Sequence, residues 1–177
     1  MNREYHHGQR ELQERFDTRR LADRLAEATS TQISDEHGAP ECSYKGGDPG
    51  FVRVVDPATV AFPVYDGNGM FLSTGNLTVN PQVGLLFVDF TTGTRLRLNG
   101  TASVELDDPL VATYPGAKFV VRVTPRAVFA NCRRYVHHYE PVDRSPFVPT
   151  ADGAPPVPDW KLDPWFEGTR VAEETQP

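Results

Sequence analysis

Residues 61–90, AFPVYDGNGMFLSTGNLTVNPQVGLLFVDF, contain the pattern that decides the fold. The stretch begins with an apolar segment of strand length and ends with an almost continuous apolar run over residues 83–90. Between the two, a loop rich in Gly and Asn leads into a segment that we predict to be a short helix. The helix should stop before Pro81, because a residue that precedes proline disfavours the α conformation. The pattern indicates two strands connected by a loop and a helix.

Alternating polar and apolar residues predict further strands on both sides of this stretch. A turn at Asp35–Gly38 joins two short extended segments, as in a hairpin, and FVRVV at 51–55 is β-branched. Downstream, TRLRLNGTASVEL at 94–106 and KFVVRVTPRAVFANC at 118–132 alternate over strand lengths. Several short antiparallel strands with one embedded helix predict a mainly β fold, a closed or partly closed β-barrel with a few helices.

The chain divides into three parts by composition. Residues 1–28 carry apolar pairs at i,i+4 spacing and are expected to form a helical lead-in. The barrel is expected to span residues 29–142. Residues 143–177 hold many prolines and few periodic apolar residues, so an extended tail is expected, with Trp160 and Trp165 packing onto a surface.

Composition and charge exclude several classes of function. A net charge of -6 argues against a phosphate-neutralising surface, so nucleic acid is not expected as a partner. No apolar run approaches the roughly 20 residues of a membrane helix, and the charged N-terminus lacks an apolar signal region. Two cysteines make no disulfide framework. We therefore expect a cytoplasmic protein without membrane contact.

The segment from Cys42 to Asn99 resembles the pyridoxamine 5'-phosphate oxidase-like family, in particular its poorly characterised bacterial members. The resemblance rests on CSYKGGDPGFVRV at 42–54, on the stretch 61–90 and on RLRLNG at 95–100. It implies a six-stranded antiparallel split barrel of the FMN-binding type. It also implies a homodimer with FMN in a groove between the subunits, and redox chemistry on a small molecule.

The same resemblance assigns the candidate cofactor site. A phosphate needs a cation and several N–H or O–H donors, which Lys45, nearby hydroxyls and the start of the helix can supply. An arginine on the sixth strand would suit the electron-rich edge of a reduced flavin. The candidate cofactor-binding residues are Ser43, Tyr44, Lys45, Tyr65, Asp66, Gly67, Asn68, Gly69, Met70, Ser73, Thr74, Asn76, Arg95 and Arg97. No catalytic residue and no metal site is assigned.

The sequence departs from the family pattern at two places. Members that form pyridoxal phosphate carry adjacent basic residues where this chain has Leu72-Ser73, and an Arg where it has Pro40-Glu41. Pyridoxamine phosphate is therefore not expected as the substrate, and phosphate affinity is expected to be lower or met by other residues.

Three functional hypotheses stay open. The first is an FMN-dependent oxidoreductase, in which the protein positions the flavin and tunes its electrostatics. The second is a non-catalytic flavin or haem carrier or sensor, with His137 or His138 as the haem ligand. The third is a reductase that uses the deazaflavin F420. The acidic tail of that cofactor would need more surface Lys and Arg for binding than this acidic chain has.

Overall fold

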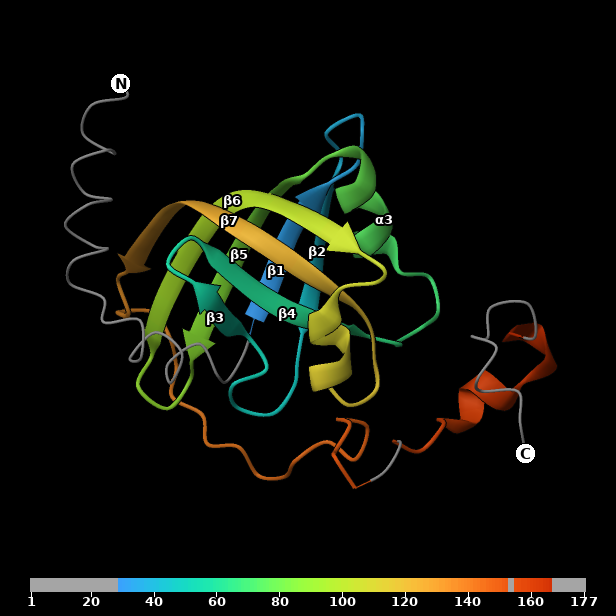
Figure 1. The fold of residues 1–177 in the computed structure, drawn as a ribbon. Coiled ribbons are helices and arrows are strands. Elements are labelled where there is room, and N and C mark those ends of the chain that lie inside the picture. The colour runs from blue at the N-terminus through green and yellow to red at the C-terminus, as the bar shows by residue number, and fades with distance from the viewer. Residues whose placement is uncertain (1–28, 153–154, 167–177) are drawn as a thin grey trace.

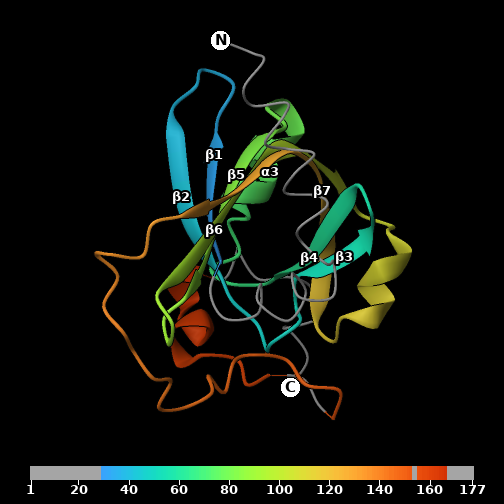
Figure 2. The same ribbon diagram turned by 90° about the vertical axis from the view of Figure 1, so that its left-hand side faces the viewer.

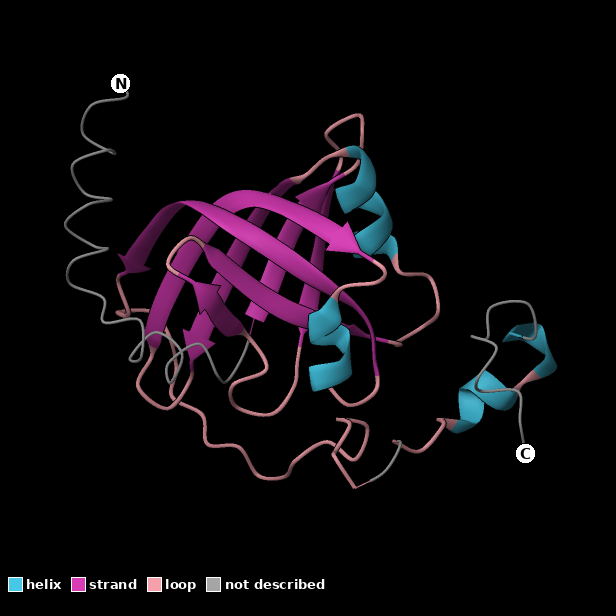
Figure 3. Ribbon diagram, viewed as in Figure 1, coloured by secondary structure: helices cyan, strands magenta, loops and turns pink. Residues whose placement is uncertain are grey.

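The computed structural model describes residues 29–152 and 155–166. The predicted helical lead-in, residues 1–28, lies outside them. The described part is built on one antiparallel sheet, with helices at its periphery (Figures 1 and 3). Its strands are β1 (Thr29–Ser34), β2 (Pro40–Lys45), β3 (Arg53–Asp56), β4 (Thr59–Tyr65), β5 (Gln82–Asp89), β6 (Thr94–Glu105) and β7 (Ala117–Asn131).

The strands lie in the order β2-β1-β5-β6-β7-β4-β3. Figure 2 shows the sheet curling so that the hairpin of β1 and β2 faces the pair β4 and β3 across the interior. The mainly β split barrel predicted from the sequence is confirmed, but the sheet has seven strands, where six were expected. β3, whose segment was predicted as a strand, is short and pairs only with β4 at one edge of the sheet.

The core fills the inside of the curled sheet. Alternate residues of β5 and β6, such as Leu85 and Leu98, point inward and are almost fully buried. They pack against Phe62 of β4 and Val123 of β7, and Leu77 of the helix joins the same cluster. Apolar side chains of this size stabilise a fold by about 1.5–3 kcal/mol each when fully buried. The alternation seen in the sequence therefore sets which face of each strand is the inner one.

The single α-helix of the described residues, α3 (Leu72–Val79), packs against β1 and β6. The helix ends at Val79 with Asn80 as its C-cap, so the predicted stop before Pro81 is confirmed. Its N-cap is Phe71, which has a φ of 47°. This left-handed backbone conformation is unfavourable for any residue that carries a side chain. An edge-to-face contact between the rings of Phe71 and Phe119, 5.2 Å apart, offsets that cost. The chain thus enters the helix through a turn held by the core.

The other helical segments are short 3-10 turns. The first, η1 (Pro109–Thr113), follows β6, and η2 (Asp159–Leu162) and η3 (Pro164–Phe166) belong to the C-terminal tail. Before η2, Arg144 makes a two-pronged ion pair with Asp48, at 2.7 and 2.9 Å, and fixes the tail to the loop after β2. In the parts of the tail that the structure describes, residues 143–152 and 155–166, no strand forms.

Close strand packing at Gly100 predicts a sensitive position. A Cβ there would collide with the carbonyl oxygen of Thr124, where the register of β6 and β7 shifts, whereas one at Gly75 in α3 would meet no atom within 4 Å. We expect G100A to lower the free energy of unfolding by about 1–3 kcal/mol through overpacking. G75A should raise it by about 0.5–1 kcal/mol, since alanine favours a helix. Urea denaturation followed by circular dichroism measures both, and equal effects of the two variants would contradict the packing argument.

Candidate functional site

A pocket of about 430 Å³ lies between β2 and the segment that leads into α3. Its volume is within the range of about 300–1,000 Å³ that is usual for small-molecule sites. The walls come from three parts of the chain: β2, the end of β4, and the loop with the first turn of the helix. The lining residues are Glu41, Cys42, Ser43, Tyr44, Lys45, Val64, Gly67, Asn68, Met70, Phe71, Leu72, Ser73 and Thr74.

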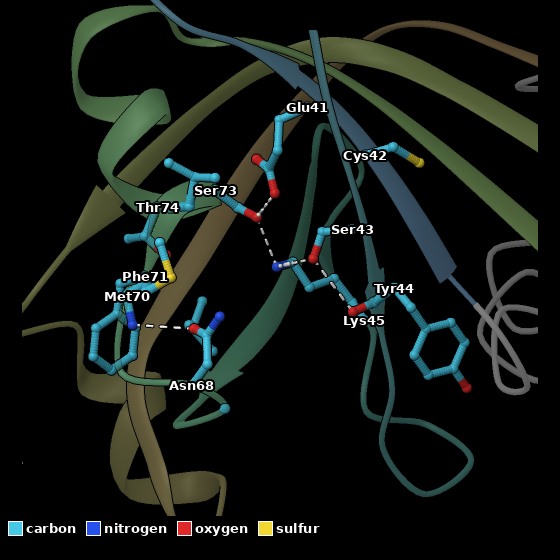
Figure 4. A pocket seen from close by; sticks show the side chains of 13 residues that line it. Glu41, Cys42, Ser43, Tyr44, Lys45, Asn68, Met70, Phe71, Ser73 and Thr74 are labelled. Carbon is cyan, nitrogen blue, oxygen red and sulfur yellow. Dashed lines mark hydrogen bonds between the residues drawn. The ribbon is translucent and has the colours of Figure 1, made fainter. Parts of the chain in front are cut away.

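The pleat of β2 decides which of its side chains reach the pocket. Successive residues of a strand point to opposite faces, so Glu41, Ser43 and Lys45 share one face. Figure 4 shows these three directed toward α3, while Cys42 and Tyr44 point away. Tyr44 is 67% exposed. It belongs to the lining of the pocket, although its side chain points away from α3. One face of a short edge strand therefore supplies one cation, one hydroxyl and one carboxylate.

These three side chains form a hydrogen-bonded chain with the helix (Figure 4). The Lys45 ammonium donates to Ser43 Oγ at 2.8 Å and to Ser73 Oγ at 2.9 Å. The Ser73 hydroxyl in turn donates to Glu41 Oε1 at 2.8 Å. Ser73 is buried in the first turn of α3, so these hydrogen bonds connect the edge strand β2 to the start of the helix. Burial lowers the pKa of Lys45 below its usual value, and the nearby Glu41 carboxylate acts in the opposite direction.

The start of α3 adds backbone donors to the pocket. The first N–H groups of any helix have no acceptor within the helix, and they carry the positive end of its dipole. No side chain caps α3, and its first intrahelical bond is donated by Gly75 N to Phe71 O at 2.8 Å. Ser73 and Thr74 look like capping residues in the sequence, but they lie inside the first turn. The N–H groups ahead of Gly75 are thus oriented for an acidic ligand group.

The loop before α3 forms the remaining wall. Asn68 Oδ1 accepts a hydrogen bond from Met70 N at 3.1 Å, which closes a tight turn beside the pocket. Met70 is 66% exposed and Leu72 is 52% exposed, so apolar side chains surround the entrance. The loop combines a polar turn with an apolar rim, as small-molecule sites commonly do.

The structure brings eight of the predicted cofactor-binding residues to the pocket and leaves six outside its lining. Those that line it are Ser43, Tyr44, Lys45, Gly67, Asn68, Met70, Ser73 and Thr74. Those that do not are Tyr65, Asp66, Gly69, Asn76, Arg95 and Arg97. Gly69 belongs to the loop at a φ of 75°, and Asn76 lies one turn further along α3.

Asp66 is engaged by the C-terminal tail. Its Oδ2 pairs with Lys161 Nζ of η2 at 2.7 Å, and the two side chains are only 7% and 6% exposed. The neighbouring Tyr65 is half-buried, and burial together with Asp48 raises the pKa of its phenol, while Arg53 acts against this. The structure therefore gives Asp66 a role in holding the tail beside the loop.

Arg95 and Arg97 lie on the outer face of β6. Arg95 donates from Nη2 to the carbonyl oxygen of Cys132, at the end of β7, and Arg97 is exposed. Their neighbours Leu96 and Leu98 point into the core, so the strand pleat directs both arginines away from the interior. Within this chain, neither guanidinium reaches the Lys45 pocket.

The histidines proposed as haem ligands lie elsewhere. His138 lies beside Gly93 in the turn between β5 and β6, where a Cβ built on the glycine would be 3.5 Å from His138 Nε2. The next residue, Tyr139, packs edge-to-face on Phe90. Neither His137 nor His138 lines the pocket. Among the described residues, no group of three or more His, Cys, Asp and Glu side chains could hold a metal ion.

Sequence reasoning missed five residues that line the pocket, namely Glu41, Cys42, Val64, Phe71 and Leu72. Glu41 was noted only as a departure from the family pattern, yet its period-two spacing with Ser43 and Lys45 could have placed all three on one face. Phe71 carries no sequence signal for its left-handed conformation, because bulky residues rarely adopt it.

Comparison with known proteins agrees with this architecture. The sequence profile described as pyridoxamine 5'-phosphate oxidase matches residues 11–132, more than half of the chain. The chain belongs to the pyridoxamine 5'-phosphate oxidase family. A search of curated proteins gives no match.

Solved structures resemble this family member in fold. HupZ from Group A Streptococcus is 16% identical, with a TM-score of 0.51, over 68% of this chain and 98% of HupZ. A putative pyridoxamine 5'-phosphate oxidase from Lactobacillus delbrueckii is 24% identical over 58% and 84% of the two chains, with a TM-score of 0.46. An FMN-binding protein from Syntrophomonas wolfei is 13% identical over 70% and 88%, with a TM-score of 0.48. No helix among the residues that the structure describes is long and apolar enough to cross a membrane.

The pocket residues supply several of the donors that a phosphate group on a ligand would need. A phosphate is bound well by a lysine, by hydroxyl donors and by the N-terminus of a helix. Lys45, Ser43 and the first turn of α3 bring these donors together at one end of the pocket. The Glu41 carboxylate is the only group in the lining that opposes an anion.

The buried pair of Asp66 and Lys161 predicts that the tail can be released without unfolding the barrel. The two tryptophans of the chain, Trp160 and Trp165, both lie in this segment, so their fluorescence reports the tail. K161M should shift the emission of Trp160, which is 42% exposed, to longer wavelength in native buffer, because the unpaired Asp66 carboxylate would favour water over a buried site.

The control for this prediction is a double-mutant cycle with D66N. If the pair acts as described, the two single variants together lose more stability than the double variant, with a coupling of at least about 1 kcal/mol in urea denaturation. Additive effects, or an unchanged emission spectrum in K161M, would show that other contacts hold the tail.

Proposed function

We propose that this protein binds FMN in the pocket between β2 and α3 and acts as a flavin-dependent oxidoreductase on a small molecule. The observation that supports this best is the convergence of Lys45 with Ser43 and Ser73, at 2.8 and 2.9 Å, beside the first turn of α3. Such a group suits a phosphate at the end of a larger ligand. Membership of the pyridoxamine 5'-phosphate oxidase family supports FMN as that ligand.

In this proposal, the protein positions the cofactor and controls its surroundings. FMN, when bound, supplies hydride or electron transfer. Lys45 holds the phosphate by charge, and the Ser43 hydroxyl and the helix N–H groups orient it. The apolar rim of Met70 and Leu72 would shield a flat ring from water. The departures at Leu72-Ser73 and Pro40-Glu41 argue for a substrate other than pyridoxamine phosphate.

Two observations weigh against haem and against F420 as the ligand of this pocket. Haem binding would need an axial ligand, but His137 and His138 lie outside the lining of the pocket. An F420 cosubstrate carries a long acidic tail, and the chain has a net charge of -6 with one lysine in the lining. A non-catalytic flavin carrier would use the same pocket, and it would show reduction of bound flavin without sustained turnover.

The first prediction concerns the chromophore and its anchor. The protein dialysed to equilibrium against FMN should take up a chromophore with the two visible absorption bands of a flavin, whereas a single Soret band in the purified protein would indicate haem. K45M should weaken FMN binding at least about tenfold, because a charge-assisted hydrogen bond to the phosphate is lost. R126M, which removes an exposed cation outside the pocket, is the matched control. Equal FMN affinity in K45M and wild type would place the phosphate elsewhere.

We also propose that the protein is a homodimer whose partner subunit covers the pocket. Tyr44, Met70 and Leu72 are large, more than half exposed and next to the pocket, and such a cluster is costly to leave in water. Trp165, which is 87% exposed, adds to the apolar surface. Family membership supports the same assembly.

The solution mass tests this assembly. Light scattering after gel filtration should give twice the chain mass of 19.7 kDa at micromolar concentration. M70D should shift the mass toward the monomer, because it places a charge in an apolar interface. V142D introduces the same charge at an exposed apolar residue outside the pocket, and its mass should equal that of wild type. A monomeric wild-type protein would refute the proposal.

A further inference from the structure

Glu41 is the one carboxylate among the residues that line the pocket. Its Oε1 accepts the Ser73 hydroxyl at 2.8 Å. Its Oε2 is buried and has no hydrogen-bond partner among the described residues. Buried carboxylate oxygens almost always accept a hydrogen bond. The Glu41 carboxylate therefore lies in the pocket with one of its two oxygens unsatisfied.

The carboxylate already accepts the hydrogen bond of one donor that a phosphate would need. A serine hydroxyl has one hydrogen to donate, and Ser73 donates it to Glu41 while its oxygen accepts from Lys45. The Glu41 charge also acts on Lys45, where it opposes the lowering of the lysine pKa by burial. Glu41 thus occupies, within this chain, part of the position that suits an anionic ligand group.

The charges in the pocket support the same conclusion. The side chains of the lining carry one positive charge, on Lys45, and one negative charge, on Glu41. A dianionic phosphate therefore meets a lysine whose positive charge is partly offset by Glu41, which is linked to it through the Ser73 hydroxyl, in partly buried surroundings where charges interact strongly. The uncharged ribityl chain of riboflavin meets no such repulsion.

We propose that Glu41 sets the affinity of the pocket for the phosphate group, so that the protein holds FMN as an exchangeable ligand and scarcely distinguishes it from riboflavin. Glu41 is a specificity-determining residue, because its carboxylate competes with the phosphate for Ser73 and Lys45. This inference rests on the proposed flavin function. It adds that bound flavin exchanges with free flavin in solution. The protein would then act with freely exchanging FMN or riboflavin, rather than with a permanently held cofactor.

The test compares the dissociation constants of FMN and riboflavin, measured by flavin fluorescence titration, in wild type and E41Q. Glutamine keeps the size of the side chain and an acceptor for the Ser73 hydroxyl, and it removes the negative charge. For wild type, the two constants should agree within about threefold. In E41Q, FMN should bind at least about tenfold more tightly than in wild type, and riboflavin should change by less than about twofold.

E36Q is the matched control. Glu36 lies in the exposed turn between β1 and β2, outside the pocket, and its substitution changes the net charge by the same amount. E36Q should leave both constants unchanged, which separates the local effect from the overall charge. Circular dichroism checks that E41Q folds. If it does not, E41A provides the same removal of charge, and FMN affinity should again rise selectively.

Failure of this inference differs from failure of the proposed function. If wild type binds both flavins and the E41Q and E41A variants leave the FMN to riboflavin ratio unchanged, Glu41 does not control phosphate affinity. A wild-type protein that already prefers FMN by about tenfold or more would equally overturn the inference, on the scale of about 1.4 kcal/mol per tenfold. If neither flavin binds to any variant, the flavin function itself is wrong, and the inference falls with it.

Discussion

The pairing of β1 with β5 is the constraint on which the pocket depends. The hairpin of β1 and β2 forms from neighbouring residues, but it joins the barrel only through β1, in the register that sets Ile33 opposite Val83. Because α3 directly precedes β5 in the chain, this register brings the inward face of β2 next to the first turn of the helix. Lys45 and Ser73, 28 residues apart in sequence, meet as a result.

The same constraint explains why the pocket lies at an edge of the sheet. β2 pairs with β1 on one side only, so its other side and its inner face remain available to other groups. An edge strand with exposed backbone groups usually needs protection, which a helix, a loop or a partner chain provides. Here α3 and the loop before it face the inner side of β2, and the exposed Tyr44 and Met70 mark the surface where we propose that a second subunit packs.

Electrostatics then define what the pocket can hold. A buried lysine without a counter-charge is unfavourable, and the lowered pKa of Lys45 reflects this cost. The Glu41 carboxylate offsets it, but at the expense of attraction for an anion. Glu41 thus stabilises the free protein and lowers the affinity of the pocket for a phosphate. The Ser73 hydroxyl connects the two charged groups. A similar use of buried charge holds the tail, where Lys161 reaches Asp66 across 95 residues.

The sequence by itself determined the mainly β class, the position of α3 and its end before Pro81, and eight of the residues that line the pocket. The fold class and the end of the helix follow from local causes, namely strand alternation, proline sterics and the turn preference of Gly and Asn, whereas the resemblance to the family assigned the eight lining residues. Tertiary structure decided which of the candidate charges share a space. The pairing of Asp66 with the tail and the contact of Glu41 with Ser73 depend on strand register and on contacts between distant segments. Such contacts form only when the sheet closes, so residue type and spacing along the chain carry no direct signal of them.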